Sequence, residues 1–369
     1  MPAYVETRSR IVAAVAIIAS LATLMLRVAG AEGVVVFAVS AVGLAGLAAL
    51  VGEGTDQLGH RLGPGATGVL QSALGNLPEF FIGIFALRAG LVEVVRSALV
   101  GSILANTLLV LGLAFIAGGL RHGPQKFGTD QTKMMSTLLV LAVAAMVIPT
   151  IAEAPGGPAS GHATELSIVV SLVLLAVFAA SLPFSIHRGM VVGAADSSHA
   201  ETGRSEAGAR AALWPVSLAV GTLLAAGIGA AFVSDWFVEA LKPAMSSLGM
   251  SQAFAGLVVV AIAGNAVENI VGIRAMLANR GDLAISLILN SSLQVALALT
   301  PALVILSLLL GGAALTLTLT PLLIAALALA TLLAALVVID GESTWLEGLA
   351  LVGLYVIIAA SVWWGAPIT

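Results

Sequence analysis

The chain alternates long apolar runs with short polar or glycine- and proline-rich breaks. A run of about 20 apolar residues is long enough to cross the hydrocarbon core of a bilayer as a helix. Backbone that faces lipid must satisfy its own hydrogen bonds, so the runs are predicted to be helices. The pattern predicts eleven spans, at residues 11–29, 33–58, 64–88, 92–118, 131–151, 164–186, 211–234, 252–278, 282–310, 316–338 and 344–364.

One polar stretch is much longer than the other breaks and divides the chain into halves. It runs from His187 to Arg210, is rich in glycine, alanine and serine, and contains only three acidic residues. This composition is typical of a flexible linker, although a regulatory or cation-sensing loop remains an alternative. We therefore expect an N-terminal helix (1–32), a first repeat (33–187), a cytoplasmic linker (188–210) and a second repeat (211–369).

Basic residues are distributed unequally between the two sides that the spans define. With the N-terminus on side A, that side receives eleven Lys and Arg residues and the other side receives four. Because cytoplasmic loops carry the excess of positive charge, the N-terminus is predicted to be cytoplasmic. The first run could also be a cleaved signal sequence, but Arg27 near the proposed cleavage site favours an uncleaved anchor. We expect a multi-pass protein of a prokaryotic inner membrane.

Composition excludes several classes of protein. The chain is 60% hydrophobic and only 9% charged, whereas soluble domains carry about 25% charged residues. The net charge of −4 is small and indicates nothing about partners, and no basic patch suggests a nucleic-acid partner. The chain has no cysteine, which excludes disulfides, thiolate metal sites and a cysteine nucleophile. It also has no glycine-rich phosphate loop of the kind that ATP-driven pumps need.

Two segments of the chain repeat each other. The segment "GNLPEFFIGIFALRAGLVEVVRSALVGSIL" begins at Gly75, and "GNAVENIVGIRAMLANRGDLAISLILNSSL" begins at Gly264. They align without a gap at an offset of 189, and one third of the positions are identical. Because five predicted helices separate the copies, the second copy is expected to be inverted, an architecture typical of transporters. We predict an all-α polytopic membrane protein with about eleven transmembrane helices, in which two inverted five-helix repeats follow an extra N-terminal helix.

Each copy places a glutamate inside an apolar span. Glu79 and Glu268 both end a Gly-Asn-x-x-Glu motif. A carboxylate at the bilayer centre costs about 3 kcal/mol on insertion scales, so both glutamates need partners. A pair of carboxylates can be satisfied by a shared cation or by protons, and a site that alternates between these states exchanges a cation for protons. The alternative is that both glutamates only hold helices together through hydrogen bonds.

The residues around the glutamates indicate which cation such a site would bind. Ca²⁺ takes six to eight oxygen ligands in flexible geometry, whereas softer metals prefer cysteine or histidine, and no predicted span contains either. Pro78 removes a backbone donor and the motif glycines allow the helices to break. The candidate metal-site residues are Glu79, Glu268, Asn76, Asn265, Gly75, Gly264, Ser102, Asn106, Ser291, Ser292 and Gln294.

Other polar residues have more than one interpretation. Small polar residues often mediate helix packing, so a direct ligand role for Ser102, Asn106 and Ser291 remains open. Six acids lie near the predicted membrane interfaces and are either solvated helix ends or a vestibule that attracts cations: Glu53, Asp56, Glu93, Asp235, Glu239 and Asp282.

These motifs resemble the calcium/proton exchanger family of the calcium/cation antiporter superfamily. The resemblance is carried by the two Gly-Asn-x-x-Glu motifs and by the Gly-Ser-Ile-Leu and Ser-Ser-Leu-Gln stretches, and it covers most of residues 33–365. It implies a transporter rather than an enzyme, without a cofactor. Its substrates would be Ca²⁺ and protons, exchanged across the bilayer by alternating access at a midplane site of two glutamates. Proton entry would drive the extrusion of cytosolic Ca²⁺.

The motifs also depart from the family pattern. Leu77 and Pro78 stand where the first motif commonly has alanine and threonine, and Asn269 replaces a common histidine in the second. These departures leave open a Na⁺/Ca²⁺ exchanger, or another cation/H⁺ exchanger, in the same fold. Sodium sites would need extra hydroxyl or carboxylate ligands, which Leu77 and Pro78 do not offer. An intramembrane enzyme or a non-transporting scaffold is a third alternative from a different class.

Overall fold

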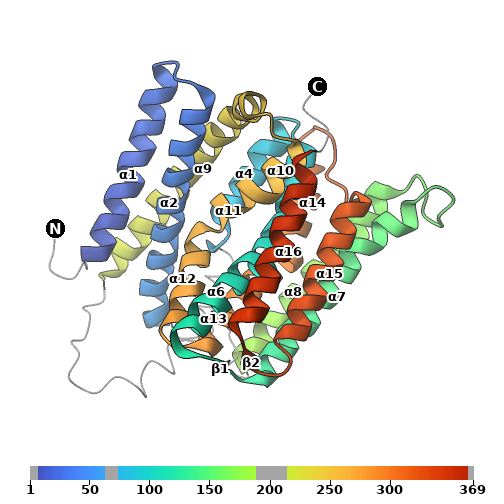
Figure 1. Cartoon of the computed structure of the whole chain (residues 1–369). Coiled ribbons are helices and arrows are strands. Elements are labelled where there is room, and N and C mark those ends of the chain that lie inside the picture. Colours follow the sequence, from blue (N-terminus) through green and yellow to red (C-terminus); the bar gives the residue numbers. More distant parts are fainter. Residues whose placement is uncertain (1–6, 63–73, 188–213, 365–369) are drawn as a thin grey trace. The chain divides into compact units, whose positions relative to one another are not determined.

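The computed structural model describes residues 7–62, 74–187 and 214–364. The described chain is almost entirely helical, with two short strands and one extended segment (Figure 1). The predicted linker at 188–210 and the first part of the predicted span 64–88 lie outside the described residues.

The first half of the described chain contains seven α-helices, two of which, α5 and α6, are joined by a π-helical turn. The elements are α1 (Thr7–Val28), α2 (Gly33–Leu62), α4 (Leu77–Arg88), α5 (Val92–Leu104), η1 (Ala105–Val110), α6 (Leu111–His122), β1 (Gln125–Lys126), α7 (Thr129–Glu153) and α8 (Ala163–His187).

The second half contains two further π-helical turns. The elements are α9 (Val216–Leu248), α10 (Gln252–Phe254), η2 (Ala255–Val260), α11 (Ala261–Gly264), α12 (Ala266–Leu277), α13 (Gly281–Gln294), η3 (Val295–Leu299), α14 (Thr300–Ser307), α15 (Pro321–Val337), β2 (Glu342–Ser343) and α16 (Trp345–Trp363).

Every predicted span contains helix where the structure describes it. Within the described residues, eight helices are long and apolar enough to cross a membrane. A ninth span results if the bent pair of helices at 252–264 and 268–277 counts as one, and α15 is a shorter apolar helix. The multi-pass architecture is therefore supported, while the count of eleven spans stays a prediction.

The chain forms two compact units that do not follow the order of the sequence. Unit 1 contains residues 1–85 and 181–247, and unit 2 contains residues 86–180 and 248–369. In unit 1, Phe37 of α2 stacks on Phe237 of α9 with ring centroids 4.6 Å apart. A Cβ added to Gly46 of α2 would lie 2.8 Å from the Cα of Ala16, so α1 and α2 pack closely. Each unit combines parts of both halves, and the inverted repeats stay a prediction.

Helices α5 and α13 each continue into a π-helical turn. The turn η1 starts at Ala105 and the turn η3 starts at Val295. The separation between these two starts differs by one residue from the repeat offset of 189. Turns of this kind are rare and occur often at functional sites. The matching positions support a duplication of this part of the chain.

The prediction of a helix from residue 316 is wrong at its start, because α15 begins at Pro321. Residues 315–320 read "LTLTLT" and are extended, with Leu315, Leu317 and Leu319 buried on one side. Alternation with a period of two is typical of a strand and not of a helix. The threonine hydroxyls between the leucines stay half-buried, and the helix starts only where Thr320 caps it.

Side chains from three helices satisfy the backbone of this extended segment. The N–H groups of its three leucines each donate to a different hydroxyl: Leu315 to Ser307 Oγ at 2.9 Å, Leu317 to Ser167 Oγ at 2.9 Å and Leu319 to Thr150 Oγ1 at 2.8 Å. Non-helical backbone at membrane depth is tolerated where the protein itself satisfies its polar groups. The serine and threonine residues that the sequence places inside apolar helices therefore have a structural use here.

The strands β1 and β2 form a short antiparallel pair at one end of unit 2 (Figure 1). Gln125 pairs with Ser343 and Lys126 pairs with Glu342. The pair joins the chain after α6 to the chain before α16, two segments far apart in the sequence.

Candidate functional site

The second Gly-Asn-x-x-Glu motif lies where a helix breaks in unit 2. Helix α11 ends at Gly264, Asn265 leaves the helical conformation with φ −96° and ψ 10°, and α12 starts again at Ala266. The helices before and after the break differ in direction by 64°. The Asn265 Nδ2 donates to the carbonyl oxygen of Ala261 at 3.0 Å, which satisfies a carbonyl group at the end of α11.

Glu268 lies in the first turn of α12, beside hydroxyl and amide groups. Its Oε2 accepts a short hydrogen bond from Ser291 Oγ of α13. The Nδ2 of Asn106, in η1, donates to the same Ser291 Oγ at 2.9 Å. A carboxylate in the first turn of a helix is also stabilised by the helix dipole. Ser291 therefore links the motif glutamate to the π-helical turn of the neighbouring helix.

The same network includes the motif asparagine and a second serine. Asn265 Nδ2 donates to Ser102 Oγ of α5 at 3.1 Å, and Asn265 Oδ1 lies 3.3 Å from Ser291 Oγ. Four of the five side chains are buried, and only Glu268 is partly exposed. The structure thus brings together five of the predicted site residues: Ser102, Asn106, Asn265, Glu268 and Ser291.

Two glycines allow the helices around this network to approach each other. A Cβ on Gly101 of α5 would lie 2.3 Å from the carbonyl oxygen of Leu257, and one on Gly256 would lie 2.3 Å from that of Val94. Real Cβ atoms do not come so close, so α5 and η2 are in direct backbone contact. This contact places Ser102 within reach of Asn265. Gly101 opens the Gly-Ser-Ile-Leu stretch, but neither it nor Gly256 was among the predicted site residues.

Two other predicted residues, Ser292 and Gln294, also lie on α13. Ser292 Oγ donates to the carbonyl oxygen of Ile288 on its own helix at 3.3 Å, and Gln294 is buried at the last position of α13. The position of Ser292 favours the alternative interpretation, in which a small polar residue serves packing.

The first motif belongs to unit 1 and, like the second, has a turn directly before the helix that carries its glutamate. Gly75 and Asn76 form a turn before α4, and Glu79 lies in the first turn of that helix. The Phe80 N–H donates to the Asn76 carbonyl at 2.9 Å, as the Asn269 N–H does to Asn265 at 3.0 Å. Pro78 falls in this first turn, where a missing N–H costs nothing.

The far end of α12 is held by side chains that the sequence analysis did not assign to the site. Gln125 Nε2 donates to the Met276 carbonyl at 3.2 Å, and His122 Nε2 lies 2.9 Å from the Leu277 carbonyl. These contacts satisfy carbonyl groups at the end of the helix that begins beside Glu268. No local pattern in the sequence indicates them, because the partners are about 150 residues apart.

The atoms of this network that could bind a cation are the oxygen atoms of its carboxylate, hydroxyl and amide groups. In the part of the chain that the structure describes, no three His, Asp or Glu side chains gather in one place. A cation bound beside Glu268 would therefore depend on hydroxyl and amide oxygens as well as on carboxylate. Hard cations such as Ca²⁺ prefer oxygen ligands of these types.

Comparison with known proteins places the chain in a family. Residues 32–187 and 218–364 match the sodium/calcium exchanger protein family. The chain is 35% identical to the Ca²⁺/H⁺ antiporter ChaA of Bacillus subtilis and 33% identical to the Ca²⁺/H⁺ antiporter of Aphanothece halophytica. Each match covers 84% of this chain, and 86% and 85% of the respective relative.

Solved structures give the same result. The structure of native YfkE is 32% identical in sequence, covers 95% of this chain and 98% of its own, and superposes with a TM-score of 0.77. The H⁺/Ca²⁺ exchanger CAX is only 16% identical and supports the fold alone, with a TM-score of 0.74 over 96% of this chain and 92% of its own. On the extent of these matches, the chain belongs to the sodium/calcium exchanger protein family.

Proposed function

We propose that the protein is a secondary active transporter that exchanges Ca²⁺ for H⁺ across the membrane. The observation that carries this proposal is the position of the Glu268 carboxylate at a helix break. It accepts a hydrogen bond from the Ser291 hydroxyl, which also contacts the side-chain amides of Asn106 and Asn265. The Ca²⁺/H⁺ antiporters among the relatives support the choice of substrates. A carboxylate in an apolar span is costly unless a cation or a proton occupies it.

In this proposal, Glu268 and Glu79 supply the charge of one midplane site. Two carboxylates neutralise a divalent cation, and the oxygen atoms of Ser102, Asn106 and Ser291 complete its coordination. When the cation leaves, protons replace it on the carboxylates. The Ser291 hydroxyl suits both states, because it donates to an ionised carboxylate and accepts from a protonated one.

Alternating access follows from the same charge requirement. A site filled by Ca²⁺ or by protons is close to neutral and can change its exposure from one side to the other. An empty site would carry two uncompensated carboxylates into a low-dielectric environment, which is unfavourable. Exchange is therefore obligatory in this scheme, and the two inverted repeats would provide the two opposite openings. With the predicted cytoplasmic N-terminus, the cell would use proton entry to extrude Ca²⁺.

A Na⁺/Ca²⁺ exchanger in the same fold is the second candidate, and the family match includes such proteins by name. Additional sodium ions need oxygen ligands beside each glutamate. The residues between Asn and Glu are Leu77 and Pro78 in the first motif and Ala266 and Val267 in the second. None of these side chains offers an oxygen atom, which favours protons over sodium.

Flux into liposomes distinguishes the two candidates. Purified protein is reconstituted with a fluorescent Ca²⁺ reporter, and a pH gradient is imposed with and without sodium. We expect Ca²⁺ flux that follows the pH gradient, needs no sodium and is lost in Glu79→Gln and Glu268→Gln. Flux that requires sodium would support the second candidate, and flux that persists in either variant would remove that glutamate from the site.

A further inference from the structure

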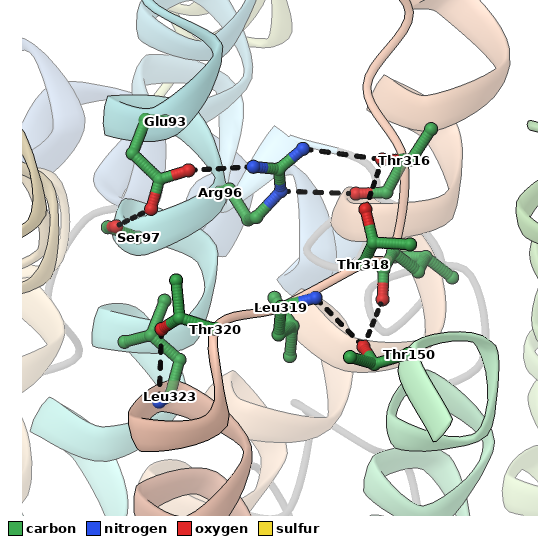
Figure 2. Close-up of polar contacts among 10 residues, drawn as sticks. Glu93, Arg96, Ser97, Thr150, Thr316, Thr318, Leu319, Thr320 and Leu323 are labelled. Atoms are coloured by element: carbon green, nitrogen blue, oxygen red, sulfur yellow. Dashed lines mark hydrogen bonds and ion pairs between the residues drawn. The ribbon is translucent and has the colours of Figure 1, made fainter. Parts of the chain in front are cut away.

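The helices α5 and α13 each carry an acid in the first turn, at positions that correspond in the repeat. These acids are Glu93 and Asp282. Glu93 lies near the segment that follows α14, because Arg96 bridges the two (Figure 2). Asp282 contacts the N–H of Gly128, which follows α6. The two helices therefore run antiparallel within unit 2, and the acids mark its opposite ends.

Arg96 binds three oxygen groups at the Glu93 end. Arg96 Nη1 forms an ion pair with Glu93 Oε2 at 2.7 Å. Its Nε and Nη2 donate to the carbonyl and to the hydroxyl of Thr316, each at 3.3 Å (Figure 2). Thr318 Oγ1 lies 2.7 Å from Thr316 Oγ1. One guanidinium thus holds a carboxylate, a carbonyl and a pair of linked hydroxyls.

These oxygen atoms are the types of ligand that Ca²⁺ takes in proteins. Both charged side chains are partly exposed, 19% for Arg96 and 33% for Glu93. Without the arginine, an ionised Glu93 beside two hydroxyls and a carbonyl would be a weak cation site. The guanidinium occupies this place as a cation that is tethered to the protein.

The second copy shows that the acid does not need an arginine to keep its position. The residue that corresponds to Arg96 is Ile285, which is 1% exposed. Asp282 is held instead by the backbone N–H of Gly128, and in the described part of the chain it forms no ion pair. The arginine is therefore a specific feature of the Glu93 end.

We propose that Arg96 is a built-in counter-ion that prevents the transported cation from binding to Glu93, Thr316 and Thr318. The naming of Ca²⁺ as this cation rests on the proposed function. In the predicted orientation the Glu93 end faces away from the cytoplasm, where extruded Ca²⁺ is released. A second site there would retain the ion, and Arg96 keeps the release path free of it.

Equilibrium binding of ⁴⁵Ca²⁺ to the purified protein tests the proposal without any transport. Arg96→Gln is expected to bind one more Ca²⁺ than the wild type, with a dissociation constant of about 10⁻³ M, as for other weak sites. Arg96→Lys keeps the positive charge and is expected to bind no extra ion, and neither does Arg96→Gln combined with Glu93→Gln. A folded Arg96→Gln protein that binds no additional Ca²⁺ would overturn the proposal.

A second measurement does not depend on the folding of Arg96→Gln. The chain has no cysteine, so Thr318→Cys provides a single thiol whose reaction rates with cationic and anionic reagents report the local charge. Adding Glu93→Gln leaves Arg96 unpaired, and the rate ratio is expected to shift towards the anionic reagent by roughly threefold. An unchanged ratio would show that Arg96 does not neutralise Glu93. Neither measurement uses flux, so failure of the proposed Ca²⁺/H⁺ exchange leaves both results interpretable.

Discussion

A methyl group at Gly101 should separate the helices that hold the hydrogen-bond network. The added Cβ in Gly101→Ala would lie 2.3 Å from the Leu257 carbonyl oxygen and 2.5 Å from the Leu257 Cα. Because real Cβ atoms essentially never come closer than 3.0 Å, α5 and η2 must move apart by at least about 0.7 Å. Overpacking of this kind typically costs about 1–3 kcal/mol.

The displacement should also reach the candidate site. Ser102 follows Gly101 directly, and its hydroxyl accepts from Asn265 Nδ2 at 3.1 Å. A further separation of about 0.7 Å would exceed the range of a hydrogen bond between these atoms. We expect Gly101→Ala to lower the thermal stability of the purified protein and to weaken Ca²⁺ binding by several-fold.

Gly353→Ala is the matched control. Gly353 lies inside α16 of the same unit, and a Cβ there would meet no heavy atom within 4 Å. Alanine favours helix over glycine, so this variant should be at least as stable as the wild type. Equal thermal stability and equal Ca²⁺ affinity of the two variants would refute the argument that backbone contact at Gly101 positions Ser102.

Three further substitutions test separate parts of the account. Ser291→Ala removes the hydroxyl between Glu268 and Asn106. Ca²⁺ affinity should fall about tenfold, the effect expected for the loss of one charge-assisted hydrogen bond. Ser291→Thr should restore part of this affinity in the same binding assay. Thr150→Val removes the hydroxyl that donates to the Leu317 carbonyl and accepts from the Leu319 N–H, so the free energy of unfolding should fall by about 1–3 kcal/mol. Thr150→Ser should be close to wild type in thermal denaturation. Arg27→Gln breaks an ion pair with Glu239 in which both side chains are largely exposed. The free energy of unfolding should therefore fall by less than about 1 kcal/mol. A larger fall would mean that the contact of Arg27 with Trp236 matters more than its charge.

The sequence predicted the helices and the core of the candidate site because both leave local signals. Apolar length marks the spans, and a costly glutamate that occurs twice at a fixed offset marks the motifs. Ser102 and Asn106 were both candidate site residues; Ser102 contacts Asn265 of the second motif, and Asn106 contacts Ser291 of α13.

Other features could not be predicted because their cause lies far away in the sequence. The π-helical turn at Asn106 has no periodicity that distinguishes it from an α-helix over six residues. The "LTLTLT" segment has a period of two, but its apolar composition also fits a span, and the span from residue 316 was predicted from its length alone. Its extended backbone depends on hydroxyls from Thr150 and Ser167, which are contributed by other helices.

The central claim is that the same carboxylates carry Ca²⁺ and protons in turn. Proton movement driven by Ca²⁺ tests it most directly, in liposomes loaded with a pH-sensitive dye and free of any initial pH gradient. When Ca²⁺ is added outside, the account predicts that protons leave as Ca²⁺ enters, and that Glu268→Gln abolishes both movements. Entry of Ca²⁺ without proton movement, or proton movement that survives in Glu268→Gln, would contradict it.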